Sequence, residues 1–198
     1  MIKFNDLSNE TPYKIFKEKY DQAIKAKQNL IEAISISSFN MKSKEVNSRY
    51  VNLKYVNNKS FIFFTNYNSP KAIEFKSHDQ IAVSIYWSSI NVQIRIKAKI
   101  HLTSDEFNQK YFIKRSPEKN ALAISSNQSK QIESYESVKE KHKKSLEFDD
   151  LTKCPSFWGG YSFTPYYFEF WEGHDSRLNK RDVYEKNGVN WNYYSLQP

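Results

Sequence analysis

The side chains with the clearest potential for chemistry form a polar cluster just after an apolar stretch. Within seven residues the chain presents hydroxyl, amide and ammonium groups, at Thr65, Asn66, Asn68, Ser69 and Lys71. Such groups at the end of a strand can hold a phosphate through side chains and backbone N–H groups. The same composition is typical of an ordinary polar loop, so the cluster alone leaves a phosphate site and a plain loop both open.

Gln93 lies in a stretch whose pattern predicts a strand with one face free for a ligand. From Val92 to Leu102, apolar residues alternate strictly with polar or basic residues, which is typical of a half-buried strand. Gln93 falls on the polar face. Residues 81–87 alternate in the same way, and the short segment 88–91 separates the two runs, which predicts an antiparallel hairpin.

The four residues that precede the polar cluster follow a different pattern. Residues 61–64 read Phe-Ile-Phe-Phe and are apolar on both faces of a strand. A strand with one face in water would alternate. We therefore expect one face to fill the core and the other to be covered by another element or another subunit. Asn57 and Asn58 suit a tight turn just before this strand.

Length and composition limit the possible classes of function. With 198 residues, we expect one domain spanning 1–198, with a loose N-terminus at 1–11. Only four glycines are present, and neither a Walker nor a Rossmann glycine motif occurs. The net charge of +8 permits an anionic ligand or weak attraction to nucleic acid. No helix-turn-helix or RNA-binding motif is evident, so we expect no nucleic-acid partner.

Cysteine, histidine and apolar runs give further limits. Cys154 is the single cysteine, which excludes an internal disulfide and a cysteine-based zinc site. The four histidines show no metal-ligand spacing, so we expect no metal. No apolar run of 18 residues occurs and Met1 leads into polar sequence, so we predict a soluble, cytoplasmic protein without membrane contact.

Periodicity and end signals predict the remaining elements. Helices are expected over 13–31, 104–114 and 130–146, with another beginning at Ser116-Pro117. Strands are expected over 33–39, 48–56, 60–66, 80–87 and 92–102. The C-terminal region from about 157 is aromatic and strand-like, with a turn at Asn187-Gly188. The sum is a mostly β (α+β) fold, an antiparallel β-barrel of six or more strands with helices around it.

With these motifs in order, the chain resembles the pyridoxamine 5′-phosphate oxidase family over essentially its whole length. The motifs that carry the resemblance are SRYVNLK (48–54), FFTNYNSPKAIEF (63–75), YWSSINVQIRI (86–96), PSFWGGYSFTP (155–165), FEFWEG (168–173) and RLNKR (177–181). The resemblance implies an FMN-binding split β-barrel and a homodimer. It also implies one FMN in each of two clefts between subunits, and a C-terminal dimerisation and cofactor region at about 157–198.

The resemblance also implies the residues around FMN. Arg49 matches an arginine at the FMN phosphate, and Thr65, Ser69 and Lys71 add to that site. Lys54, Gln93, Trp171 and Arg181 match residues around the flavin ring and ribityl chain. Gln128 and Ser129 match a pair donated by the other subunit. The alternatives for these residues are surface cations, core packing or exposed polar positions.

For the substrate, the resemblance implies a phosphorylated small molecule. Lys54, Tyr111 and Arg115 match the set that holds its phosphate. Tyr111 and Arg115 are four residues apart on a predicted helix and share a face. Arg177 matches the arginine over the reacting carbon. The implied reaction transfers a hydride from that carbon to the flavin, and molecular oxygen then reoxidises the flavin and yields hydrogen peroxide.

Three positions depart from the family pattern. Pro70 stands where the family has an arginine at the FMN phosphate. Lys119 stands where it usually has a serine in the substrate-phosphate set, and Asn179 replaces a histidine that contacts the substrate. These changes leave three hypotheses: an oxidase of pyridoxamine or pyridoxine 5′-phosphate, an FMN oxidase with another substrate, as in phenazine biosynthesis, or a non-catalytic binder of flavin or another anion.

Overall fold

The computed structural model describes all residues 1–198, in sixteen helices and strands. The helices are α1 (Thr11–Lys25), α2 (Pro70–Ser77), α3 (Asp105–Phe112), α4 (Pro117–Ser125) and α5 (Tyr135–Phe148), with a short 3₁₀ turn at Ser88–Ile90. The first five strands are β1 (Lys3–Asn5), β2 (Ala33–Asn40), β3 (Glu45–Asn52), β4 (Tyr55–Asn57) and β5 (Ser60–Asn66). The others are β6 (Gln80–Trp87), β7 (Val92–Leu102), β8 (Trp158–Glu172), β9 (Lys180–Asn187) and β10 (Asn190–Ser195).

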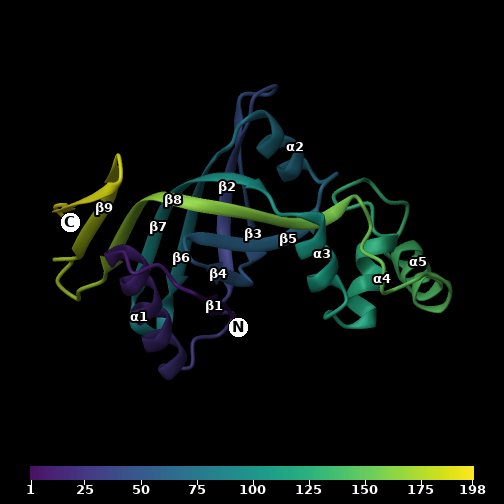
Figure 1. Ribbon diagram of the computed structural model, residues 1–198, viewed down its shortest axis with the longest axis horizontal. Coiled ribbons are helices and arrows are strands. Elements are labelled where there is room, and N and C mark those ends of the chain that lie inside the picture. The colour runs from purple at the N-terminus through teal and green to yellow at the C-terminus, as the bar shows by residue number, and fades with distance from the viewer.

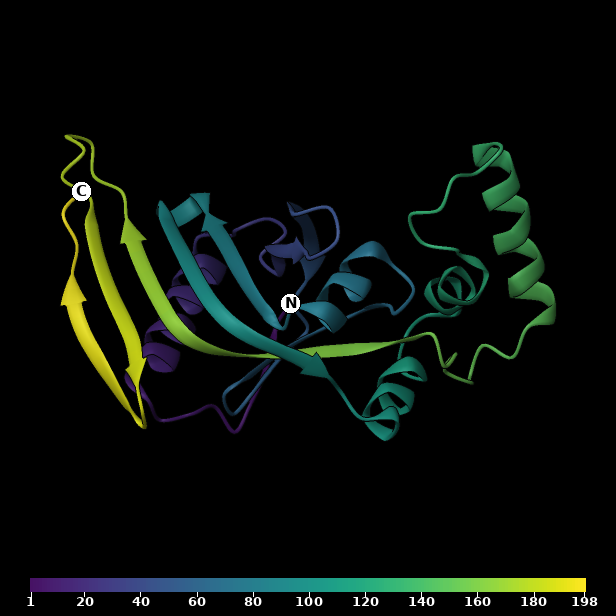
Figure 2. The same ribbon diagram turned by 90° about the horizontal axis from the view of Figure 1, so that it is seen from above.

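All ten strands belong to one strongly curved sheet, and β8 is its longest strand. The order is β1-β4-β5-β8-β7-β6-β2-β3, with β9 on β8 and β10 on β9. The first part of β8 pairs with β5 and its last part pairs with β9, while β7 follows its other edge. Figure 1 shows β8 crossing the molecule from the C-terminal hairpin to the α3–α5 helices, and Figure 2 shows these two parts at opposite ends. The split barrel is thus one sheet that divides along β8.

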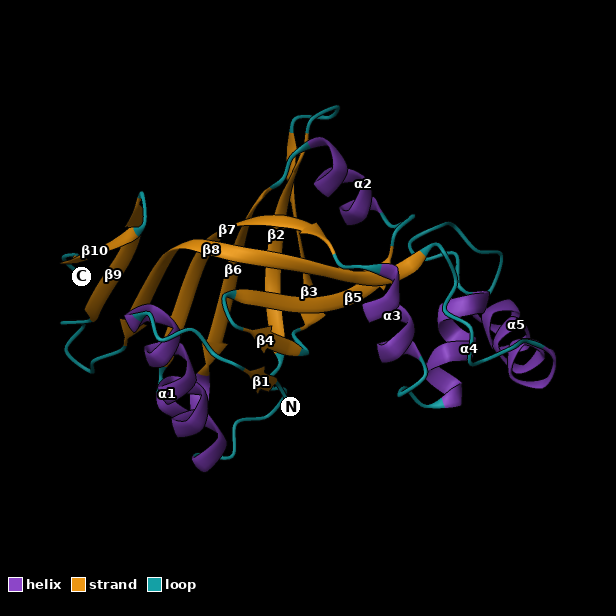
Figure 3. Cartoon of the chain, in the orientation of Figure 1, coloured by secondary structure: helices purple, strands orange, loops and turns teal.

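The core lies between the curved sheet and α1. The apolar residues of α1 are spaced so that Tyr13, Phe16 and Tyr20 share one buried face. Phe16 packs edge-on against Phe61 at 5.0 Å between ring centroids, and its ring is 5.7 Å from that of Trp87. Helices and strands are distinguished in Figure 3, where α1 covers one side of the barrel and α3, α4 and α5 extend from its far end. The layers predicted from the sequence are therefore confirmed.

Several local predictions are also confirmed. β6 pairs antiparallel with β7 over the whole of β6, as the alternation predicted. Asn58 and Gly188 both adopt positive φ, at 50° and 62°, in the turns predicted there. Phe61 and Phe63 fill the core, and on the other face Phe64 stacks on Tyr111 of α3, so that face is covered by an element of the same chain.

Other local predictions are wrong. The N-terminus at 1–11 is not loose, because β1 pairs in parallel with β4 and Ile2 is buried. The first helix ends at Lys25 rather than at residue 31. The strand expected over 48–56 is two strands, β3 and β4, and helix α2 was not predicted at all. No helix has both the length and the apolar character needed to cross a membrane.

Candidate functional site

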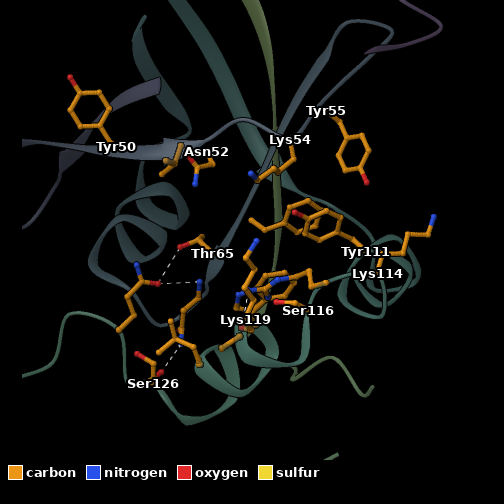
Figure 4. Close-up of a pocket in the computed structure, with 18 of the residues that line it drawn as sticks. Tyr50, Asn52, Lys54, Tyr55, Thr65, Tyr111, Lys114, Ser116, Lys119 and Ser126 are labelled. Atoms are coloured by element: carbon orange, nitrogen blue, oxygen red, sulfur yellow. Dashed lines mark hydrogen bonds between the residues drawn. The ribbon is translucent and has the colours of Figure 1, made fainter. Parts of the chain in front are cut away.

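A cavity of about 700 Å³ opens between β3–β5 and the α3–α4 helices. Its lining is cationic, with Lys3, Lys54, Lys71, Lys114, Arg115 and Lys119 among 21 residues and no aspartate or glutamate. Figure 4 shows Lys54 and Lys119 extending into this space from opposite sides, with Thr65 at one end and Tyr111 nearby. Because like charges face the same volume without a carboxylate, the cavity is suited to an anion.

Aromatic rings form one wall of the cavity and hold Arg115. Phe64 of β5 stacks on Tyr111 of α3 with 3.6 Å between ring centroids, and the ring of Trp158 of β8 is nearly parallel to both. The guanidinium of Arg115 lies over Trp158 at 4.3 Å. Nη2 of Arg115 donates to the Lys119 carbonyl at 2.9 Å, whereas its buried Nη1 has no hydrogen-bond partner. Burial lowers the pKa of Arg115 and raises that of Tyr111.

Arg115 is therefore a fixed, partly desolvated cation with an unused donor. The chain supplies no carboxylate to this guanidinium, so a phosphate or carboxylate in the cavity that it lines would compensate its charge. The prediction that Tyr111 and Arg115 share a face agrees with the structure, because both line the same cavity.

Lys54 reaches the cavity from the connection between β3 and β4. Its ammonium lies 3.7 Å from the carboxylate of Glu32, which also binds the N-terminal ammonium of Met1 at 3.3 Å. Lys3 of β1 lines the cavity beside them. The N-terminal strand thus contributes a cation that the prediction of a loose N-terminus did not include.

The polar cluster at residues 65–71 lies at the other end of the cavity. Thr65, Ser69 and Lys71 are all buried, and Thr65 and Lys71 line the cavity. Lys71 begins α2 just after Pro70, and its Nζ donates to Ser69 Oγ at 3.2 Å. Burial, aided by the nearby Arg49 guanidinium, lowers the pKa of Lys71 to about 8. The structure thus assembles the cluster as a buried cation supported by hydroxyls, which a plain loop would not provide.

Gln128 completes this end within the same chain. Its Oε1 accepts from Thr65 Oγ1 and from the Asn66 N–H, both at 3.4 Å. This chain therefore places its own Gln128 at this end of the cavity, and the expectation that a second subunit donates Gln128 to the cofactor stays a prediction. Ser129 is exposed, adopts a positive φ of 67° and does not line the cavity.

Arg49 lies behind Lys71 and does not line the cavity. Its Nη2 forms an ion pair with Glu74 of α2 at 3.1 Å, and its Nη1 donates to Ser38 and Ile36. Arg49 is thus close to Lys71, as predicted, but in the free chain a buried carboxylate occupies part of its guanidinium.

The residues expected around the flavin ring form a second group on the sheet. Gln93 of β7, Trp171 of β8 and Arg181 of β9 are direct neighbours across three strands. Arg181 makes a double hydrogen bond to one carboxylate oxygen of the buried Glu169, at 2.7 and 2.9 Å, and donates to the Gln197 carbonyl. Gln93 and Trp171 are half-buried and make no side-chain hydrogen bonds within the chain. These three residues are referred to below as the sheet-end group.

Arg177 lies in the exposed turn between β8 and β9, with a positive φ of 61°. Its backbone N–H donates to the His174 carbonyl, while its side chain has no hydrogen-bond partner. Asn179 accepts a hydrogen bond from the His174 N–H at 3.1 Å. The residue that replaces the family's histidine therefore stabilises its own turn.

Within one chain, the cofactor residues expected at the cavity (Thr65 and Lys71) do not meet those of the sheet-end group. Thr65 pairs with Gly159 and Gln93 pairs with Trp171, so the groups are separated by 12 residues of β8, about 40 Å of strand. The cavity collects Lys54, Thr65, Lys71, Tyr111, Arg115 and Gln128. The sheet-end group and Arg177 lie at the opposite end of β8, near the C-terminal hairpin (Figure 2).

Sequence reasoning missed several residues of the site. In the sequence, Trp158 stands out only as part of the motif PSFWGGYSFTP. In the structure it begins β8, and its ring lies against the guanidinium of Arg115. The ion pairs of Glu74 and Glu32 could not be recognised from the sequence, because the cations that they bind are distant along the chain. No group of three or more acidic, histidine or cysteine side chains is arranged to hold a metal ion.

Comparisons with known proteins agree with this arrangement. A family model described as "Pyridoxamine 5′-phosphate oxidase" matches residues 20–144. A second, described as "Pyridoxine 5′-phosphate oxidase C-terminal dimerisation region", matches residues 158–198. The pyridoxine/pyridoxamine 5′-phosphate oxidase of Colwellia psychrerythraea is 34% identical over 96% of this chain and 88% of its own length. That of Coxiella burnetii is also 34% identical, over 94% and 95% respectively.

Solved structures share the fold. PhzG from Burkholderia lata 383, in complex with tetrahydrophenazine-1-carboxylic acid, superposes with a TM-score of 0.90 at 24% identity, covering 96% of this chain and 93% of that chain. A pyridoxamine 5′-phosphate oxidase-related, FMN-binding protein from Nostoc punctiforme superposes with a TM-score of 0.78 at 11% identity, covering 96% and 99%.

Proposed function

The chain belongs to the pyridoxamine 5′-phosphate oxidase family, and on that premise we propose that it oxidises pyridoxamine or pyridoxine 5′-phosphate to pyridoxal 5′-phosphate. It is an FMN-dependent oxidoreductase. FMN, when bound, would supply the acceptor for a hydride from the substrate and the route by which the electrons reach molecular oxygen, which would yield hydrogen peroxide. We also place this reaction in the cytoplasm, as the sequence predicts.

The observation that carries the substrate proposal is the state of Arg115. It is fixed on Trp158, has a buried Nη1 without a partner, and faces a cavity without carboxylates. A phosphomonoester carries close to two negative charges at neutral pH and three acceptor oxygens. We assign Arg115, Tyr111 and Lys54 to the substrate phosphate, and Arg177 to the reacting end of the substrate.

Two groups of residues suit two parts of FMN, its phosphate and its flavin ring. Lys71, supported by Ser69 and Thr65, offers a buried ammonium whose only hydrogen-bond partner is a hydroxyl, which suits the FMN phosphate. Arg49, behind Lys71, adds a second cation. Gln93, Trp171 and Arg181 offer an amide, an apolar ring and a guanidinium, which suit the polar edge and the face of the flavin.

We propose that two chains form a homodimer in which one supplies the cavity and the other supplies the sheet-end group. The separation of the two groups along β8 supports this arrangement. The match of residues 158–198 to a dimerisation region also supports it, because these residues include Trp171 and Arg181. A two-fold dimer places each chain's sheet-end group against the other's cavity, giving two equal sites.

The test is a visible absorption spectrum of the purified protein, followed by anaerobic addition of pyridoxamine 5′-phosphate. The proposal predicts a flavin spectrum that bleaches on addition, and recovery in air with formation of pyridoxal 5′-phosphate and hydrogen peroxide. A flavin spectrum that stays unchanged with both pyridoxamine and pyridoxine 5′-phosphate would contradict the proposed substrate and leave the cofactor assignment standing.

A second candidate is an FMN oxidase with a different anionic substrate. Two observations favour it: Asn179 is bound to its own turn, and Lys119 brings an extra ammonium into the cavity. It predicts that pyridoxamine 5′-phosphate bleaches the flavin much more slowly than a substrate with an additional acidic group. Rapid bleaching by pyridoxamine 5′-phosphate would exclude it.

A further inference from the structure

Glu74 is a buried carboxylate next to the cations that we assign to the FMN phosphate. It lies on α2 one turn after Lys71, and its side chain is only 2% exposed. An acidic group weakens an anion site when it acts only through its charge. Its presence here therefore needs a structural reason.

Three side chains donate hydrogen bonds to this carboxylate. Arg49 of β3 donates to Oε2 at 3.1 Å, and Ser38 of β2 donates to the same oxygen. Asn47 of β3 donates to Oε1 at 2.8 Å. Arg49 also donates to Ser38, so the guanidinium, the hydroxyl and the carboxylate form a closed ring of contacts. Such a ring fixes the orientation of Arg49, because Nη1 is held by strand β2 and Nη2 by helix α2.

The contacts leave part of Arg49 available. Its Nη1 contacts Ser38 and Ile36, and its Nη2 contacts Glu74. Nε makes no hydrogen bond within the chain, and Nη2 has a second N–H. Arg49 therefore keeps donors beyond those that Ser38, Ile36 and Glu74 use, and a phosphate at Lys71 would need to break none of these contacts to receive them.

Glu74 also acts on Lys71. The charged groups that act on this buried ammonium are Arg49 of β3, which disfavours its charge, and Glu74 of its own helix, which favours it. The neighbouring hydroxyl of Ser69 and the cavity-lining Thr65 are neutral. Removal of the Glu74 charge would leave two adjacent cations, one of them buried, with no carboxylate between them.

We propose that Glu74 is a positioning residue for the cofactor phosphate, which orients Arg49 and places a buried carboxylate one helical turn from Lys71. The inference rests on the proposed function, because it takes Arg49 and Lys71 as the phosphate site of FMN. Glu74 itself touches no ligand.

The test compares the Kd for FMN of the wild type and of Glu74→Gln at pH 6.5 and pH 8.5, by quenching of flavin fluorescence. Loss of the carboxylate makes Lys71 lose its proton at lower pH. The ratio of variant to wild-type Kd should therefore rise threefold or more between the two pH values. Protonation of the FMN phosphate affects both proteins equally and cancels in the ratio. A ratio that stays constant or falls would overturn the role at Lys71, because a merely structural defect would weaken binding equally at both pH values.

Two further variants complete this test. Glu136→Gln makes the same change on exposed α5 and should leave the ratio at one at both pH values. Lys71→Arg in the Glu74→Gln chain replaces the titrating ammonium by a permanent charge, and it should remove the pH dependence of the ratio. If Glu74→Gln does not fold, Lys71→Arg alone decides: it should abolish the weakening of FMN binding that the wild type shows above pH 8, and persistence of that weakening would overturn the inference.

The orientation of Arg49 is tested by a double-mutant cycle at pH 6.5, where Lys71 is charged. If Glu74 acts through Arg49, the effects of Glu74→Gln and Arg49→Lys on the Kd for FMN should depart from the product of the single effects by threefold or more. Independent effects would overturn this part.

Failure of the proposed function would look different. A wild type that binds no FMN at any pH contradicts the cofactor site, and the effect of Glu74 on Lys71 is then measured on the free chain. The pH dependence of Lys71 acetylation by acetic anhydride, followed by mass spectrometry, should have a lower midpoint in Glu74→Gln than in the wild type. Equal midpoints would overturn the inference.

Discussion

At the cavity, Lys71, Arg115 and Lys119 have no ion-pair partner, whereas at the sheet end Arg181 and Arg95 share the buried carboxylate of Glu169. The two regions therefore differ in what stabilises their charges. The sheet end is neutralised within the free chain, with Tyr167 donating to the same carboxylate. The cavity keeps two desolvated cations, Lys71 and Arg115, without a neutralising ion pair. This difference supports the proposal that the cavity binds the phosphates and that the sheet end presents an ordered surface to the flavin.

The largest effect is expected at Arg115, the fixed cation of the cavity. Arg115→Ala removes a charge-assisted contact worth about 1.5–3 kcal/mol, which raises the KM for pyridoxamine 5′-phosphate roughly 10- to 150-fold. The kcat should change little, because the phosphate is remote from the reacting carbon. Steady-state kinetics check this, with Lys110→Ala on the exposed side of α3 as the matched control. An unchanged KM would remove Arg115 from the substrate site.

The second-largest effect is expected at Lys71, where removal of the charge should stabilise the folded chain. Burial, aided by the Arg49 guanidinium and only partly offset by Glu74, lowers the pKa of Lys71 from 10.5 to about 8. At neutral pH its charged form therefore destabilises the folded chain, by about 3 kcal/mol at most. Lys71→Met should raise the free energy of unfolding at pH 7 and abolish the FMN affinity, which is a trade of function for stability.

The pH dependence of this effect follows from the lowered pKa. Between about pH 8 and 10.5 the unfolded chain keeps a proton on Lys71 that the folded chain loses, so the stability of the wild type rises with pH there. The advantage of Lys71→Met should thus be full below pH 8 and shrink towards pH 10.5. Urea unfolding at pH 7 and pH 9.5 checks this, with Lys76→Met on the exposed side of α2 as control. A Lys71→Met chain that is less stable than the wild type would contradict the proposed difference between the cavity and the sheet end.

At the sheet end, by contrast, removal of a cation should lower the free energy of unfolding. Arg181→Met removes a double hydrogen bond from the buried Glu169 and leaves Arg95 as its one cationic partner. We expect a loss of about 1–3 kcal/mol in the free energy of unfolding. Lys180→Met, whose ion pairs on the same strand are largely exposed, should cost much less. Urea unfolding measures both, and a stabilised Arg181→Met chain would show that the two regions do not differ in this way.

The smallest effect concerns Lys119, the ammonium that replaces the family's serine. Because it is exposed, Lys119→Ser should raise the KM for pyridoxamine 5′-phosphate only roughly two- to fivefold. Salt screens exposed charges, so the difference should shrink at high ionic strength. KM values at 0.05 and 0.5 M salt (about 14 and 4 Å of screening length) check this, with Lys139→Ser on α5 as control. A salt-independent difference would contradict a purely electrostatic role.

The parts of the fold that could be predicted are those determined by local patterns. Strict alternation placed β6 and β7, and the Asn-Asn and Asn-Gly pairs placed their turns. Helix α2 was missed because its buried face includes Lys71 and Glu74, so its periodicity does not look amphipathic. Strand β1 was missed because three residues give no periodic signal, and its order comes from pairing with β4, some fifty residues further along.

The candidate site shows the same division. Residues close together in sequence, such as Tyr111 and Arg115, could be placed together from helical spacing. The carboxylates that decide the charge of each cation could not, because Glu32, Glu74 and Glu169 are brought to their partners by sheet pairing and helix packing. The position of Gln128 beside Thr65 could not be predicted either, because only the fold brings these two residues together.

The central claim is that each site uses the cavity of one chain and the sheet-end group of its partner. It is tested most directly by mixing two inactive variants, Lys71→Ala and Arg181→Ala, after reversible dissociation, at an FMN concentration that neither homodimer binds. In half of the dimers one site combines an intact cavity with an intact sheet end, so we predict recovery of about a quarter of wild-type oxidase activity. A mixture that stays as inactive as its two components would show that each site is built from one chain, and would contradict the account.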